Sequence, residues 1–403
     1  MIKENKKTPE IRFPGFTEDW EQRKLSEFVD KAVDNRGKTP PLDENGTHPL
    51  IEVSALGGVH PDYSKVEKYL NDNSFENNLR AYIKEGDILF TTVGSIGLVS
   101  LMDSREEAAI AQNIVAFRAK ENFVPEYLYA LFSNEENQYK AKRIVMGAVQ
   151  PSIKVSQLVD VEYMLTENVK EQKKIGAFFS NLDHLITLHQ RKCDALQTLK
   201  KSMLQKMFPK KGSSVPEIRF PSFTEDWEQR KFGEVAVRES KSEMSSADMP
   251  CVEYEDVIAN EGQLNKDISL KEVQKKGIVF DGSQVLYGKL RPYLHNWLNP
   301  DFIGVAVGDW WVLKPIETDK NFIYRLIQTQ QFDDVANLSA GSKMPRADWN
   351  LVSETEFLIP SMMEEQSKIA EYFSNLDTLI TLHQRKCDTL KELKKGMLQK
   401  MFV

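Results

Sequence analysis

Residues Glu171 to Phe208 read EQKKIGAFFSNLDHLITLHQRKCDALQTLKKSMLQKMF, and residues Glu365 to Phe402 read EQSKIAEYFSNLDTLITLHQRKCDTLKELKKGMLQKMF. The two stretches are identical at 29 of 38 positions, without a gap. Apolar residues recur at intervals of three and four, which predicts a long helix with one apolar stripe. At 1.5 Å per residue, each helix is expected to be roughly 55–60 Å long. Pro209 ends the first helix.

The expected stripe follows a repeat of seven residues with further apolar positions between. It comprises Ile175, Leu182, His189, Leu196 and Met203 with Phe178, Leu185 and Leu199, and in the second copy Ile369, Leu376, His383, Leu390 and Met397 with Tyr372, Leu379 and Leu393. We interpret the two histidines as a polar layer that fixes register and not as metal ligands. A long helix with one apolar stripe needs a partner, and the simplest partner is its own copy. The sequence therefore predicts an intramolecular helix pair with a pseudo-two-fold axis.

A second repeat precedes each variable region. Pro9 to Leu25 read PEIRFPGFTEDWEQRKL, and Pro216 to Phe232 read PEIRFPSFTEDWEQRKF, with two differences. The order block, variable region and helix thus occurs twice. The predicted fold is α+β, with two globular domains joined by two long antiparallel helices. Its expected parts are residues 1–170 (block and first domain), 171–208 (first helix), 209–364 (linker, block and second domain) and 365–403 (second helix).

Composition indicates an ordinary folded chain in a reducing compartment. The 403 residues are 41% hydrophobic with a net charge of −7, and no apolar run reaches the ~18 residues of a membrane span. The N-terminus is charged and lacks a signal-peptide core. The three cysteines form no CxxC motif, so reduced thiols are expected. We therefore expect a cytoplasmic location and no membrane association.

Catalytic motifs are absent from the sequence. There is no HExxH, paired-cysteine or G-x-S-x-G pattern. Gly37-Lys38-Thr39 lacks the upstream glycine of a phosphate-binding loop, and Gly94-Ser95-Ile96-Gly97 is short enough to be a turn. Glu171-Gln172-Lys173 resembles half of a nuclease motif, but it opens the long helix and its copy has Ser367 in place of the lysine. Helix capping is the favoured interpretation, and no catalytic or metal-binding residue is expected.

The two variable regions retain traces of a common plan. Residues 86–90 resemble residues 282–287, both being β-rich runs that follow a glycine. Residues 147–151 align with residues 341–345 at the 194-residue offset of the helix repeat. A constant frame with divergent inserts suggests two related targets held at a set distance. Double-stranded DNA fits, since its dyads let two domains address half-sites about one helical turn apart.

The helix segments EQKKIGAFFSNLDHLITLHQRK and EEQSKIAEYFSNLDTLITLHQRK resemble the conserved helices of type I restriction–modification specificity subunits. The stretches GDILFTTVGSIG, LYGKLRPYL and GSKMPRADW are similar to their target-recognition domains. The resemblance implies a DNA-reading subunit without catalysis and a bipartite, asymmetric target. It also implies two modification subunits that bind S-adenosylmethionine and grip the helices, together with restriction subunits. We expect no cofactor on this chain, and S-adenosylmethionine, ATP and Mg on the partners.

Base readout requires forked or amide side chains on loops that can enter the major groove. The candidates in the first domain are Arg36, Lys38, Thr91, Thr92, Ser95, Gln150, Ser152 and Lys154. Those in the second are Lys289, Arg291, Tyr293, His295, Asn296, Lys343 and Arg346. Trp310 and Trp311 are more typical of a core. The candidates for partner docking on the helices are Phe179, Ile186, Arg191, Lys200, Phe373, Ile380, Arg385 and Lys394.

The charge balance of the variable regions opposes tight DNA binding. The first variable region, residues 26–170, holds 15 basic and 22 acidic residues. The second, residues 233–364, holds 13 basic and 21 acidic residues. Acidic domains neutralise phosphates poorly, so we expect the lone chain to bind DNA weakly and the modification subunits to supply much of the backbone contact. The alternative is a scaffold that holds two different proteins on a symmetric helical frame, which the acidic charge also suits.

Overall fold

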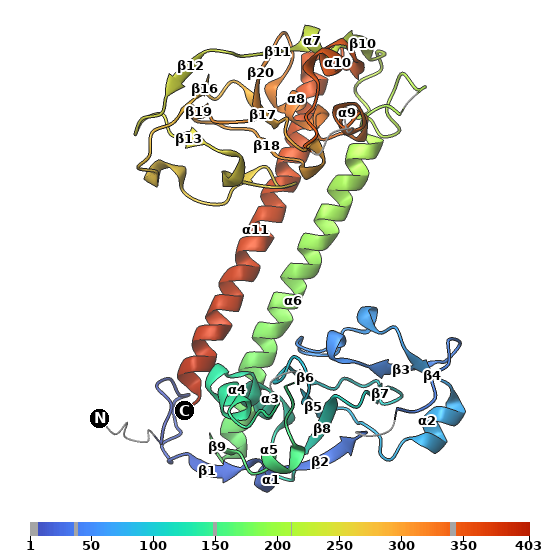
Figure 1. Ribbon diagram of the computed structural model, residues 1–403, viewed down its shortest axis with the longest axis vertical. Helices are drawn as coiled ribbons and strands as arrows, with labels where there is room; N and C mark the ends of the chain where they lie inside the picture. The colour runs from blue at the N-terminus through green and yellow to red at the C-terminus, as the bar shows by residue number, and fades with distance from the viewer. Residues whose placement is uncertain (1–6, 36–38, 148–150, 211, 339–343) are drawn as a thin grey trace. The chain divides into compact units, whose positions relative to one another are not determined.

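A computed structural model describes residues 7–35, 39–147, 151–210, 212–338 and 344–403. The chain is α+β and forms two compact units, residues 1–190 with 384–403, and residues 191–383 (Figure 1). The long helices α6 (Val169–Lys206) and α11 (Met363–Met401) each contribute to both units. Among the described residues, no helix is both long and apolar enough to cross a membrane.

The first unit is built on a four-stranded antiparallel sheet. Its order is β2 (Val29–Asp34), β8 (Ile114–Ala119), β5 (Ile88–Thr91) and β6 (Val99–Leu101). A smaller sheet has the order β4 (Tyr69–Leu70), β3 (His48–Ile51) and β7 (Ala109–Ile110), with β3 and β7 parallel. The short helices are α1 (Leu25–Phe28), α2 (Asp72–Asn78), α3 (Pro125–Ser133), α4 (Glu135–Lys142) and α5 (Val155–Leu158).

The second unit repeats the central sheet. Its order is β11 (Ala236–Arg238), β20 (Trp310–Pro315), β17 (Val285–Gly288) and β18 (Trp297–Leu298). The other sheets are β12 (Ser242–Met244), β16 (Lys276–Phe280), β19 (Gly304–Ala306) and β13 (Cys251–Val252), and the pair β14 (Val257–Ile258) and β15 (Gln263–Leu264). The short helices are α7 (Phe232–Val235), α8 (Lys320–Leu326), α9 (Gln330–Ala336) and α10 (Trp349–Glu354).

The duplicated block pairs with the segment that leads into each long helix. In the first unit β1 (Glu21–Lys24) lies antiparallel to β9 (Glu162–Leu165). In the second unit β10 (Glu228–Lys231) pairs with β21 (Glu356–Ile359) in the matching register. The sequence repeat of the block therefore corresponds to one repeated tertiary arrangement.

A buried ion pair joins each block to the start of its helix. Arg12 donates to the Glu171 carboxylate from Nε at 2.6 Å and from Nη2 at 2.9 Å, and Arg219 donates to Glu365 at 2.7 and 2.8 Å. Both glutamates are buried, at 0% and 1% exposure. Because the Glu171 side chain binds Arg12, the cap of the first turn of α6 is the Asn168 side chain, which accepts from the amide of Glu171. A buried carboxylate needs a charged partner, which explains why both copies of the block keep the arginine.

The adjacent glutamine connects each variable domain to its helix. Gln172 accepts from the amide of Val124 and donates to the Thr166 carbonyl, at 2.9 Å each. Gln366 makes the same two contacts with Asp319 and Pro360. The dipeptide Glu-Gln that opens both helix repeats is therefore a fixed attachment point for the domain.

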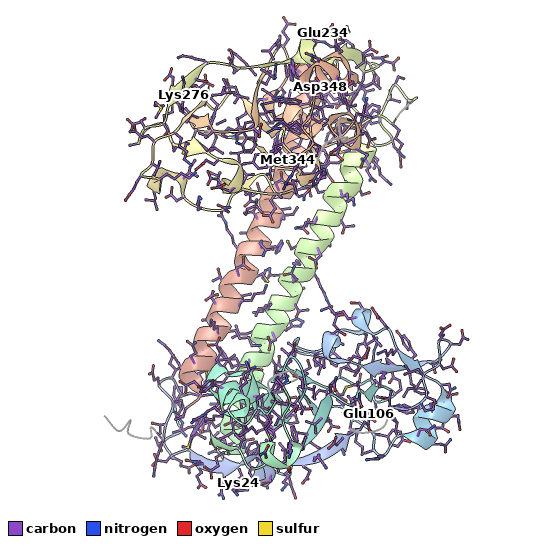
Figure 2. The ribbon with its side chains drawn as sticks, in the orientation of Figure 1. Lys24, Glu106, Glu234, Lys276, Met344 and Asp348 are labelled. Carbon is purple, nitrogen blue, oxygen red and sulfur yellow. The ribbon has the colours of Figure 1, made fainter. Side chains whose placement is uncertain are left out.

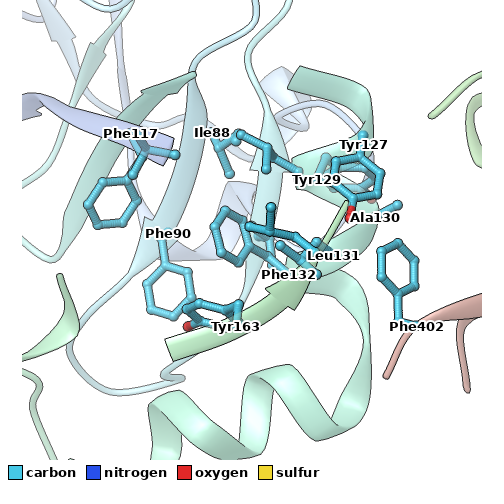
Figure 3. Packing of buried hydrophobic residues seen from close by; sticks show 14 of the residues in the cluster. Ile88, Phe90, Phe117, Tyr127, Tyr129, Ala130, Leu131, Phe132, Tyr163 and Phe402 are labelled. Atoms are coloured by element: carbon cyan, nitrogen blue, oxygen red, sulfur yellow. The ribbon is translucent and has the colours of Figure 1, made fainter. Parts of the chain in front are cut away.

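Aromatic side chains fill the core around each attachment point. Phe402, directly after α11, packs against Trp20, Tyr127 and Phe179 with ring centroids 5.7–6.0 Å apart. Figure 3 shows Phe402 beside Tyr127. In the second unit Phe208 packs in the same way against Trp227, Phe322 and Phe373. Each unit thus joins the beginning of one long helix to the end of the other, and the two run antiparallel.

The buried stripe of the helices differs in part from the predicted one. Leu185 and Leu199 are 39% and 42% exposed, and their counterparts Leu379 and Leu393 are 43% and 47% exposed, so the predicted burial of all four was wrong. The second line of buried positions is instead shifted by one residue, and it includes Phe179 and Cys193, each 1% exposed. Lys200 also lies on this line, because its ammonium group pairs with Asp377 at 2.7 Å.

An ion-pair network on the long helices differs between the two units. In the second unit Asp377 accepts from Lys200 and also from Arg325 of α8, at 2.6 Å. In the first unit the equivalent Asp183 pairs with Lys394 at 2.6 Å, and the position equivalent to Arg325 is Ala130 of α3. The other oxygen of Asp183 is buried and has no hydrogen-bond partner among the described residues. Burial raises the pKa of Asp183 against the opposing effect of Lys394.

Candidate nucleic-acid interface

Two segments of the second unit that are distant in sequence form one surface. The loop after β17, residues 289–296, lies beside residues 344–348, the described part of the segment that precedes α10. The amide of Arg291 donates to the Pro345 carbonyl at 2.7 Å, and the amide of Ala347 donates to the Lys289 carbonyl at 2.9 Å. Figure 2 labels Met344 and Asp348, the first and last residues of this second segment. These bonds bring Lys289, Arg291 and Arg346, three of the predicted site residues, together.

A carboxylate holds two of these cations. Asp309 lies between β19 and β20, and it accepts from Arg346 Nε and Nη2 at 3.2 Å each. Lys289 Nζ lies 3.7 Å from the same carboxylate. The Arg346 side chain is 53% exposed and the Asp309 side chain is 26% exposed. The guanidinium plane is therefore fixed at the surface by a partner that is itself fixed to the sheet.

The backbone of the loop adopts an unusual conformation at its two ends. Arg291 and His295 have φ angles of +47° and +52° and flank a short 3-10 turn. Contacts with other segments hold this conformation, since the His295 ring hydrogen-bonds to the Asn260 and Asp333 side chains at 2.7 and 2.9 Å. Tyr293, at the tip of the loop, is 53% exposed. Left-handed backbone at non-glycine residues costs of order 1–3 kcal/mol each and is found at functional sites.

Other predicted residues of this unit support the loop from within. Asn296 is 6% exposed, and its carbonyl accepts from the amide of Gly288 at 2.7 Å. Trp310 and Trp311 are 1% and 3% exposed, as expected for core residues. The Tyr254 hydroxyl donates to the Leu290 carbonyl. Asp309 and Tyr254 were not among the residues predicted from sequence, although the acidic residue directly before Trp310 and Trp311 could have been noticed as a polar group at the start of an apolar run.

The first unit brings the equivalent segments together. The loop after β5 and the segment from Pro151 meet where Val93 forms a bridge with Ser152. The amide of Gly94 donates to the Pro151 carbonyl at 3.2 Å, and the amide of Ile153 donates to the Thr92 carbonyl at 2.8 Å. The same two loops are therefore juxtaposed in both units, although their side chains differ.

The predicted site residues of the first unit fall into two groups. Thr91 and Thr92 are fully buried, and their hydroxyls donate to the Ser95 and Asn113 carbonyls. They shape the turn, whereas Ser95 and Lys154 are exposed and Ser152 is half-buried. Arg36, Lys38, Gln150 and Lys343 lie outside the described residues.

The predicted docking residues on the helices are also divided. Phe179 and Phe373 are 1% and 0% exposed and belong to the cores of the units, so a partner cannot reach them here. Ile186 and Ile380 are half-buried, and Arg191 and Arg385 are exposed. The remaining two candidates, Lys200 and Lys394, pair with aspartates on the other long helix.

A hollow of about 840 Å³ lies beside the loop surface of the second unit. Lys289, Trp311 and Trp349 line it together with Arg238, whose guanidinium lies 4.8 Å from the Trp349 ring centroid. Within the described residues, no group of three His, Cys, Asp or Glu side chains could hold a metal ion. The site therefore offers charged and aromatic groups for binding.

Comparison with known proteins finds similarity in both halves of the chain. A family model described as the type I restriction modification DNA specificity domain matches residues 17–198 and 224–392. The type I restriction enzyme MjaVIII specificity subunit of Methanocaldococcus jannaschii is 23% identical over 94% of this chain and 91% of its own length. The S subunit of a type I restriction–modification system from M. genitalium has a TM-score of 0.69 at 15% identity, covering 98% of this chain and 99% of that one. A chain from a structure on complex assembly and conformational transition of the type I R-M system has a TM-score of 0.51 at 15% identity, with the same coverage of both chains.

Proposed function

This chain belongs to the type I restriction–modification DNA specificity family, and on that premise we propose that it is the DNA-reading subunit of such a complex. Each variable domain reads one half of a bipartite, asymmetric target in double-stranded DNA. The long helices set the separation of the half-sites and dock two modification subunits, and restriction subunits join through these. The chain itself has no catalytic role, and S-adenosylmethionine, ATP and Mg act on the partners.

The observation that carries this proposal is the repeated juxtaposition of two loops. In both units the loop after one strand, β5 or β17, is hydrogen-bonded to the segment that precedes the last short helix, α5 or α10. The frame is constant, but one unit presents Ser95, Ser152 and Lys154 and the other presents Lys289, Arg291 and Arg346. Side chains on a fixed backbone that differ between the halves are suited to different base sequences.

Exposed leucines on the long helices support the docking of two copies of one partner. In the first unit Leu185, Leu188 and Leu393 are 39%, 39% and 47% exposed. Their repeat equivalents in the second unit, Leu379, Leu382 and Leu199, are 43%, 60% and 42% exposed. Apolar side chains that repeat on a helix face indicate a protein contact. These leucines replace Phe179 and Phe373 in the proposed docking surfaces.

The half-site assignment is tested by methylation mapping. Cells that express the chain with its modification subunits are sequenced for modified bases, once with the natural chain and once with Arg291→Ala. Loss of a base contact costs about 1–3 kcal/mol, so the variant should relax one half of the motif and leave the other half unchanged. Equal loss in both halves would instead indicate a folding or assembly defect. Addition of one turn to both long helices should also change the gap, and an unchanged gap would contradict the spacing role.

The acidic surplus of the variable regions favours a second candidate, a scaffold that holds two different proteins without nucleic acid. Capture of the chain with its partners, with and without nuclease, separates the two. Retention of all partners, combined with no methylation motif in the mapping experiment, would support the scaffold.

A further inference from the structure

Asp309 occupies a place in the second unit that has an exact counterpart in the first. The amide of Lys289 donates to the Asp309 carbonyl at 2.9 Å, and the amide of Thr92 donates to the Asn113 carbonyl at 2.9 Å. Asp309 precedes β20 and Asn113 precedes β8, which are equivalent strands of the two central sheets. The backbone at this place is therefore the same whether the side chain is a carboxylate or an amide.

The side chain at this place varies together with its neighbours. Asp309 lies beside Lys289 and Arg346, whereas the residues at the matching positions around Asn113 are Thr92 and Ser152. The unit with two cations has the carboxylate, and the unit with two hydroxyls has the amide. Since the fold accepts either residue, the carboxylate in the second unit is explained by the cations and not by the backbone.

The geometry of the pair suits one kind of readout. Arg346 uses Nε and Nη2, which form the side edge of the guanidinium, to donate to both oxygens of Asp309. The guanidinium is a planar group with five donors, and the two bonds to Asp309 set the orientation of its plane. The base edge that accepts two parallel hydrogen bonds from arginine in the major groove is that of guanine, through O6 and N7.

We propose that Asp309 is a positioning residue that holds Arg346, with Lys289, to read a guanine in the half-site of the second domain. The inference rests on the proposed function of the chain and deepens it, because it names a base and the residue that orients its reader. An exposed arginine otherwise samples many rotamers, and ordering such a side chain on binding costs conformational entropy. A carboxylate fixed at the strand start removes part of this cost in advance.

The test uses the chain in complex with its modification subunits. The probes are a short duplex with the methylation motif mapped for the natural complex, the same duplex with the second domain's half-site scrambled, and duplexes in which each guanine of that half-site is replaced in turn by 7-deazaguanine, which lacks N7. Fluorescence anisotropy gives the affinity for each. The natural complex should lose about tenfold in affinity at one substituted guanine.

The variants are Asp309→Asn, Asp309→Glu and Arg346→Ala, with Asp248→Asn as a control that removes one exposed acidic charge from the same domain. Asp309→Asn should bind the intact target several-fold more weakly and respond less to 7-deazaguanine, while binding to the scrambled duplex is unchanged. Arg346→Ala should lose the response, and Asp309→Glu should recover part of it. The fold tolerates the amide, as Asn113 demonstrates in the first unit.

Three results would overturn the inference. The first is a natural complex that prefers the motif but responds to no substituted guanine in that half-site. The second is an Asp309→Asn complex that matches the natural one. The third is tighter binding of both target and scrambled DNA by Asp309→Asn, which would make the carboxylate a competitor of DNA for Arg346. A natural complex with no preference for the motif would overturn the proposed function as well.

Discussion

Replacement of Arg12 by methionine should destabilise the first unit by about 3–5 kcal/mol, because it leaves the Glu171 carboxylate buried without its charged partner. Glu171 is 0% exposed and the Arg12 side chain 13% exposed, and two hydrogen bonds of 2.6 and 2.9 Å join them. With an effective dielectric constant of about 20, unit charges about 3 Å apart attract by roughly 5–6 kcal/mol. Desolvation of the carboxylate offsets this attraction in the natural chain, but the desolvation cost remains when the arginine is removed.

The chain has two units, so a single unfolding transition is not expected to describe it. Native-state hydrogen exchange, followed by mass spectrometry in increasing urea, gives the local free energy of opening for peptides within residues 169–190. Peptides from Met363 to the middle of α11, which belong to the second unit, serve as an internal reference. The reduction should be confined to the first unit.

Two further variants complete the experiment. Lys24→Met removes an exposed pair, since the Lys24 and Asp160 side chains are 48% and 65% exposed, and should cost less than about 1 kcal/mol. Arg12→Met combined with Glu171→Leu replaces the ion pair by apolar groups and should recover most of the loss. The reasoning is refuted if Arg12→Met costs no more than Lys24→Met, or if the double variant is as unstable as the single one.

Three other variants test specific contacts by urea titration, with hydrogen exchange of peptides from the affected unit as the readout. Arg325→Ala removes a side chain 3% exposed and leaves Asp377 paired with Lys200 alone, so the second unit should lose about 1.5–3 kcal/mol, the range for a hydrogen bond to a charged group; a loss below 1 kcal/mol would contradict this. Gly262→Ala should destabilise the same unit by about 1–3 kcal/mol, because an added Cβ would lie 1.9 Å from the Tyr324 hydroxyl at a φ of +67°; an unchanged midpoint would argue against it. Burial raises the pKa of Asp183, so the folded state holds its proton more tightly and stability falls as pH rises from about 4 through the folded pKa. Asp183→Asn should flatten this decline above pH 4, and an unaltered slope would refute the assignment.

The loops that carry the candidate site were only partly predictable from sequence. The alignment of residues 147–151 with residues 341–345 indicated equivalent positions, and the hydrogen bonds of Ser152 and Arg346 to the neighbouring loops agree with it. The burial of the individual candidate side chains was harder to predict. Thr91 is the last residue of β5 and Thr92 follows it, yet both are buried, and their hydroxyls donate to backbone carbonyls inside the turn.

The sequence by itself determined the duplicated plan of this protein, since the 29 of 38 identical helix positions and the apolar spacing of three and four residues can be read directly from the order of the residues. Tertiary structure alone decided which side of each helix is buried. Leu199 is exposed while Lys200 lies on the buried line, because Asp377, which is far away in sequence, neutralises the lysine charge. The pairing of Asp309 with Arg346 likewise joins residues that are distant in sequence. Local periodicity specifies a helix or a strand, but the cost of burying a charge depends on partners that only the folded chain brings near.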